Sequence, residues 1–216
     1  MRCLRQTCIL GRMREISNIH AFEDDDFLHA CAVGSAVVAV VCLCLLLALF
    51  WLLPVVGCTL PGVPSGMEWN AIGSRPMLSV IAWLAAVVAG TFAALAVHEG
   101  VHAVFFRLFA PRGAHVTFGI NWKTAMAYAC ADGVVYERRH YLVVSLAPTV
   151  AVTAILVSLG AASGFPFTCL LVASLHLTGC VGDWCYSWRI ARNPAILWCE
   201  DTSWGVRFLG EEDGAL

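Results

Sequence analysis

The residues best suited to chemistry form the motif HEGVH at 98–102. Its histidines, His98 and His102, are four positions apart, so on a helix they project from one face, one turn apart. This spacing lets both imidazoles hold one metal ion, which we predict to be Zn2+, with Glu99 beside it as general base. Because the motif lies in an apolar segment (77–109), where ionisable side chains are costly unless paired, coordinated or wetted, we predict a zinc site. Two packed or interfacial histidines are the alternative.

A catalytic zinc site needs a third protein ligand and an open coordination position. We predict Asp183 as this ligand, because it ends the last apolar span and follows small residues that permit close helix approach. An ordinary carboxylate at a membrane boundary is the alternative. We predict His176 as a catalytic donor to a developing oxyanion, against a packed, satisfied histidine. Other ligand candidates are Glu137, His140, His176 and, less strongly, Cys180 and Cys185.

The predicted chemistry is peptide hydrolysis. Zinc would polarise the scissile carbonyl, and Glu99 would accept a proton from water and pass it to the leaving amine. A peptide bond inside a helix is shielded, so a substrate would have to be locally extended. Alternating residues within 115–130 predict a β-hairpin or two edge strands that would pair with such a segment. A plain hairpin that covers the helix ends is the alternative.

The composition predicts a polytopic membrane protein, because 60% of the residues are apolar and only 13% are charged. The expected fold class is all-α, with about four transmembrane helices and a short β-hairpin-like cytosolic loop. Short strands are possible in the C-terminal tail around 196–199 and 205–209, and many turn residues predict an irregular loop at 54–76. The expected spans are 30–53, 77–106, 141–162 and 165–181.

The expected organisation is an N-terminal cytosolic segment (1–29), a four-span metalloprotease-like domain (30–183) and a cytosolic tail (184–216). Placing both termini in the cytosol puts 12 of the 13 lysines and arginines on that side, with only Arg75 outside. We therefore expect a multi-pass protein of the cell membrane. In this topology His98 lies roughly 12 Å inside the cytosolic boundary, at the same end as Asp183.

Four stretches of the chain carry a resemblance to known proteins: HEGVHAVFFRLF (98–109), VTFG (116–119) with Tyr128, YLVVSLAP (141–148) and 179–183. They resemble the site-2 protease-like membrane zincins and, more closely, a family of small bacterial and archaeal zincin peptidases. The resemblance covers roughly residues 77–190 and implies an intramembrane metalloprotease whose zinc is held by two histidines and a later aspartate, here matched by Asp183. This chain has Val-Gly-Asp-Trp at 181–184, where site-2 proteases carry an Asn-Pro-Asp-Gly-like motif.

Three functions are compatible with the sequence. The first is a zinc-dependent intramembrane endopeptidase acting on membrane protein or peptide segments within the lipid bilayer. The second is a non-enzymatic membrane protein with a structural metal site or a partner-binding role. The third is a proton or metal transporter, which is disfavoured because the first span and most of the third have no ionisable residue. No basic face suggests nucleic acid binding.

Overall fold

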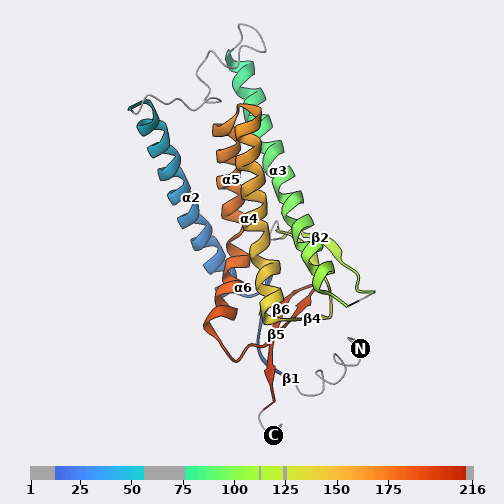
Figure 1. Cartoon of the computed structure of the whole chain (residues 1–216). Coiled ribbons are helices and arrows are strands. Elements are labelled where there is room, and N and C mark those ends of the chain that lie inside the picture. The colour runs from blue at the N-terminus through green and yellow to red at the C-terminus, as the bar shows by residue number, and fades with distance from the viewer. Residues whose placement is uncertain (1–12, 56–75, 112, 124–125, 213–216) are drawn as a thin grey trace. The chain divides into compact units, whose positions relative to one another are not determined.

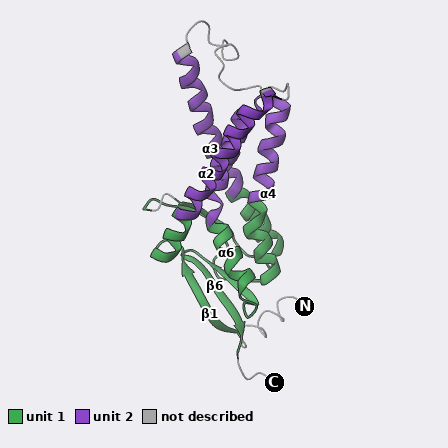
Figure 2. Cartoon of the chain, turned by 90° about the vertical axis from the view of Figure 1, so that its left-hand side faces the viewer, with its two compact units in different colours: residues 1–32, 99–148, 182–216 green, residues 33–98, 149–181 purple. Residues whose placement is uncertain are grey.

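The computed structural model describes residues 13–55, 76–111, 113–123 and 126–212. It divides into two compact units, which Figure 2 colours separately. Apart from its ends, the irregular loop predicted at 54–76 lies outside the described residues. Unit 1 comprises 1–32, 99–148 and 182–216; unit 2 comprises 33–98 and 149–181.

The predicted spans are helical (Figure 1). Three helices are long and apolar enough to cross a membrane. Two shorter helices, which meet near Cys180 at a bend of 49°, would form a fourth span if the pair crosses as one. Length and composition thus suggest a membrane protein with three to four spans. The three long helices are α2 (Asp25–Val55), α3 (Pro76–Phe109) and α4 (Arg138–Ser163), and the bent pair is α5 (Pro166–Gly179) and α6 (Val181–Arg192).

Helix α2 presents apolar side chains to its surroundings. None of its most apolar 18-residue window is buried, and Val40, Leu45 and Leu52 are each about 60% exposed. Exposed apolar residues scattered singly are normal on a soluble protein, but a whole helix of them is not. The surface of α2 therefore suits contact with lipid.

Inside unit 2, helix α5 packs closely on its neighbours. A Cβ added at Gly90 of α3 would lie 3.3 Å from Val172, and one added at Gly160 of α4 would lie 2.9 Å from an α5 side chain. The Trp83 indole of α3 donates a hydrogen bond to Thr168 of α5 (3.0 Å). Small residues let these backbones approach, as is usual between apolar helices.

Unit 1 contains a four-stranded antiparallel sheet in the order β1-β6-β5-β4, and a separate two-stranded hairpin (Figure 1). The all-α class is therefore wrong in detail: the protein is mostly helical but has antiparallel sheet as well. The sheet strands are β1 (Met13–His20), β4 (Val134–Glu137), β5 (Trp198–Thr202) and β6 (Gly205–Glu211); the hairpin strands are β2 (Thr117–Asn121) and β3 (Met126–Cys130).

Some of these strands were expected. The hairpin predicted within 115–130 is confirmed as β2 and β3, and the two short strands expected in the tail are β5 and β6, shifted by a few residues. Strands β1 and β4 were missed. The first is polar, carries a bulge between Glu15 and Ser17, and pairs with β6 from the other end of the chain, so no local pattern marks it.

The buried carboxylate of Asp201, on β5, joins three parts of unit 1. Its side chain accepts hydrogen bonds from the Ala131 backbone N–H (2.7 Å) and from the Tyr141 hydroxyl (3.1 Å). Its backbone carbonyl accepts from the Gly133 N–H (2.9 Å). Strand β5 is thereby fastened to the turn before β4 and to the first turn of α4. Burial raises the pKa of Asp201 to about 6, although these hydrogen bonds act in the opposite direction.

Gly205, where β6 begins, permits the close approach of the first strand. Its φ is 148°, and an added Cβ would lie 2.0 Å from the Ile19 carbonyl oxygen. We predict that Gly205→Ala lowers the unfolding free energy by about 2–4 kcal/mol through strain and overlap. Thermal unfolding of the detergent-solubilised protein measures this. Gly179→Ala, with nothing within 4 Å of the added Cβ, is the control and should leave Tm within a few degrees; an equal loss in both variants would contradict the prediction.

The raised pKa of Asp201 predicts a pH dependence of stability. The folded-state value is about 6 and the ordinary value is 3.8, so the folded state favours the protonated carboxyl and loses stability as the pH rises through this window. Two pKa units correspond to at most ~3 kcal/mol. Asp201→Asn cannot ionise, so its Tm should fall less between pH 4 and pH 7 than that of the wild type.

The exposed neighbour Asp132 provides the matched control, because its carboxylate accepts a hydrogen bond from the Ser203 backbone N–H (2.9 Å) in the same region. Asp132→Asn should keep the wild-type pH dependence. If Asp201→Asn loses as much stability as the wild type between pH 4 and pH 7, Asp201 is not the titrating group.

Candidate metal centre

Both motif histidines lie on α3, an uninterrupted helix that continues from unit 2 into unit 1 between His98 and Glu99. The imidazoles of His98 and His102 are therefore one helical turn apart, as the sequence predicts. Each is buried, with 6% and 8% of its surface exposed. Buried imidazoles need partners for their polar nitrogens, and the structure shows different partners within each unit.

In unit 1, His102 is oriented by a backbone carbonyl. Its Nδ1 lies 3.0 Å from the Val144 oxygen on α4. A carbonyl only accepts, so Nδ1 carries the proton, and in the neutral ring Nε2 keeps the lone pair that a metal needs. That Nε2 lies 3.5 Å from the Asp183 carboxylate on α6. Two ligands of a tetrahedral zinc with bonds of about 2.1 Å are roughly 3.4 Å apart, so this pair fits a zinc ion.

Two contacts within unit 1 place this pair. The Tyr136 hydroxyl, from β4, donates to the Phe106 carbonyl of α3 (3.2 Å). The hydroxyls of Ser145 on α4 and Ser187 on α6 are 2.8 Å apart. Because Val144 precedes Ser145, and Ser187 lies one turn after Asp183, the serine pair brings the backbone acceptor and the carboxylate to the same region.

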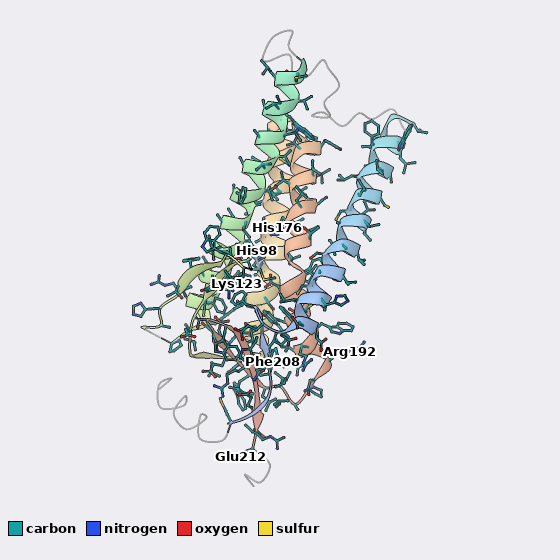
Figure 3. The ribbon with its side chains drawn as sticks, turned by 180° about the vertical axis from the view of Figure 1, so that it is seen from behind. His98, Lys123, His176, Arg192, Phe208 and Glu212 are labelled. Carbon is teal, nitrogen blue, oxygen red and sulfur yellow. The ribbon has the colours of Figure 1, made fainter. Side chains whose placement is uncertain are left out.

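In unit 2, His98 pairs with His176 of α5, and Figure 3 shows these two labelled side chains together. His98 Nδ1 and His176 Nε2 are 3.0 Å apart, so one nitrogen donates to the other. The Cys180 thiol is buried beside them, with Sγ 3.6 Å from His176 Nε2 and 3.9 Å from His98 Nδ1. These three residues form a group that could hold a metal ion.

The other predicted residues lie elsewhere. Glu99, the predicted base, is half-buried directly after His98. Glu137 is exposed at the end of β4, and the His140 ring stacks on Phe109, with ring centroids 4.4 Å apart. Neither Glu137 nor His140 belongs to a metal-holding group among the described residues. The role of His176 at an oxyanion stays a prediction.

The sequence analysis missed one partner of the motif histidines, the Val144 carbonyl, and gave another, Cys180, too little weight. The Val144 carbonyl carries no side-chain signal, so only the fold could show it. Cys180, treated as a minor candidate, follows His176 by four positions, which is the same one-turn spacing that marks the motif histidines. This spacing was readable from the sequence and would have paired the two residues.

One comparison with known proteins gave a match. Residues 91–197 match the model of a family described as “Putative zincin peptidase”. The matched stretch is just under half of the chain and includes the 98–102 motif and Asp183. It supports a zincin-like family, suggests a metallopeptidase and implies zinc. No curated protein and no solved structure matches the chain.

Removing the Asp183 carboxylate charge tests the metal centre. We expect the detergent-purified protein to hold about one zinc per chain, and Asp183→Asn to lower zinc affinity by at least about tenfold, because a neutral amide is a poor ligand. Metal analysis after dialysis against a zinc buffer measures this. Glu137→Gln, an exposed carboxylate also in unit 1, is the matched control and should keep the wild-type zinc content. Wild-type zinc content in Asp183→Asn would contradict the assignment.

Proposed function

We propose that this protein is a zinc-dependent intramembrane endopeptidase that hydrolyses peptide bonds of membrane-embedded protein segments. The observation that carries the proposal is the pair of His102 and Asp183, whose facing atoms have the spacing of two zinc ligands while the other ring nitrogen is tied to Val144. The zincin-peptidase family match and the apolar helices support it.

The proposed metal ligands are His98, His102 and Asp183. His98 joins the set because it precedes His102 by one turn on an uninterrupted helix. Its Nδ1 faces His176, and if that nitrogen donates, Nε2 keeps the lone pair for the metal. Both histidines would then bind the metal through Nε2. Three protein ligands would leave one position open for water or substrate, as a catalytic zinc site requires.

When bound, zinc supplies Lewis-acid polarisation of a carbonyl and eases deprotonation of water. The chain's own residues supply the rest. Glu99, adjacent to the first ligand in the motif, accepts the proton of the attacking water and returns it to the leaving amine. His176 accepts the Nδ1 proton of His98 and holds that ring in the ligating tautomer. We therefore favour an orienting role for His176 over direct contact with an oxyanion.

Substrate binding is proposed for the hairpin of unit 1. The two-stranded sheet β2-β3 has no third strand among the described residues, so its outer edges remain available for a locally extended segment. Tyr128 packs over Gly119 on one face of the hairpin, where an added Cβ would lie 2.4 Å from the tyrosine ring. The opposite face exposes the apolar side chains of Phe118 and Ile120, which would contact an apolar substrate.

The membrane placement follows from charge. We propose a multi-pass cell-membrane protein with both termini in the cytosol, because this arrangement places all but one lysine or arginine on the cytosolic side. The metal site then lies near the cytosolic ends of the spans. This depth would give water a short path to half-buried residues such as Glu99.

Exchanging the proposed base tests the function. Glu99→Gln keeps the size of the side chain and the metal ligands but cannot accept a proton. We expect it to retain about one zinc per chain and to cleave at least about 100-fold more slowly than wild type. The substrates are two internally quenched apolar peptides in detergent, identical except that one carries Asn-Gly at its centre. The peptide with Asn-Gly should be cleaved faster, because its helix opens more easily.

Glu137→Gln serves again as the control and should cleave at the wild-type rate. Cleavage by Glu99→Gln at the wild-type rate would remove Glu99 from the mechanism. Zinc in the wild type with cleavage of neither peptide would favour the structural metal site of a non-enzymatic membrane protein.

A further inference from the structure

A second set of potential metal ligands lies wholly inside unit 2. It consists of the buried side chains of His98, His176 and Cys180, from α3, α5 and the residue that follows α5. Cys180 is fully buried, and its Sγ contacts the ring nitrogens of both histidines. Three potential ligands of this kind converge at one point without any carboxylate among them.

We propose that His98, His176 and Cys180 form a second metal-binding set that takes thiophilic cations. Tetrahedral zinc with bonds of about 2.1 Å to nitrogen and 2.3 Å to sulfur places two nitrogens roughly 3.4 Å apart and nitrogen and sulfur roughly 3.6 Å apart. The observed N–N separation is 3.0 Å, and the two N–S separations are 3.6 and 3.9 Å. Shifts of a few tenths of an ångström in these separations would bring the three ligand atoms to the distances expected around one metal ion.

The ligand chemistry decides which ions this set prefers. A thiolate and two imidazoles are softer donors than two imidazoles and a carboxylate, so Cd2+ and Cu+ should favour the Cys180 set over the Asp183 set. Binding must remove the thiol proton of Cys180, because the thiolate is the ligand. The cation neutralises the charge that would otherwise be costly to bury.

The proposal has a regulatory consequence that rests on the proposed function. A neutral imidazole carries one proton, so His98 can offer only one nitrogen at a time. The catalytic set uses Nε2 with the proton on Nδ1, whereas the Cys180 set uses Nδ1 with the proton on Nε2. Occupation of one set therefore excludes His98 from the other. A thiophilic ion at Cys180 would remove a ligand from the catalytic zinc and inhibit the enzyme.

Cadmium binding to the whole detergent-purified protein tests the set. Thiolate bound to Cd2+ gives an ultraviolet charge-transfer band, which reports sulfur ligation independently of activity. We expect Cys180→Ala and His176→Ala each to lose the part of the band that belongs to this site. Cys169→Ala removes a thiol from α5 outside the cluster and should keep the full wild-type band. Thiols common to all variants cancel in the difference spectra.

A full wild-type band in Cys180→Ala would overturn the proposal, and a full band in His176→Ala would overturn this ligand set. Zinc content measured in the same samples tests the exclusion. Cd2+ should displace the bound zinc from the wild type but not from Cys180→Ala, and retention of zinc beside the sulfur-bound cadmium would overturn the shared use of His98.

Asp183→Asn separates this inference from the proposed function. Asp183 belongs only to the proposed catalytic set, so this variant should lose zinc and keep the cadmium–thiolate band. If it retains zinc while Cys180→Ala loses the band, the catalytic assignment fails and the second set stands. If it loses zinc while Cys180→Ala keeps the band, the second set fails and the catalytic assignment stands.

Discussion

A histidine that binds a metal through one nitrogen needs an acceptor for the proton on the other, and inside an apolar helix the protein must provide it. The two motif histidines meet this requirement differently. His102 donates from Nδ1 to the Val144 carbonyl in unit 1, and His98 has His176 at its Nδ1 in unit 2. The contact with Val144 leaves Nε2 of His102 to face an ion, and the contact with His176 influences which nitrogen His98 would offer. The chemistry of the motif therefore depends on residues that the motif does not contain.

The sheet of unit 1 matters to the site through helix α4. Asp201 on β5 binds the Tyr141 hydroxyl in the first turn of α4, and the carbonyl of Val144, three residues later, accepts the His102 proton. The Tyr136 hydroxyl fixes β4 to α3 near Phe106. A sheet that contains strands from near both ends of the described chain is thereby connected to a proposed metal ligand through short contacts, none of which involves a motif residue other than His102.

The sequence predicted the parts that local patterns encode. Apolar runs gave the spans, one-turn spacing gave the histidine pair, and the position of Asp183 at the end of the last span anticipated its contact with His102. Strand β1 was not predicted because the strand that it pairs with, β6, lies far away in the sequence. The contact of the Val144 carbonyl was not predicted because every residue has a backbone carbonyl, and only the packing of α4 brings this carbonyl to His102. The 98–102 motif could be read locally, but its tautomers depend on tertiary structure.

The position of His98 explains how one ring could serve both proposed ligand sets. Along α3 it is one turn from His102, as the proposed set with a carboxylate requires. Across unit 2 it faces His176, which is itself one turn before Cys180, and these two direct it toward a site with sulfur. Moving one proton between its nitrogens exchanges the sets without changing the charge of the neutral ring. A hard, oxygen-containing set and a soft, sulfur-containing set that compete for one imidazole would make the choice of metal ion itself the control of activity.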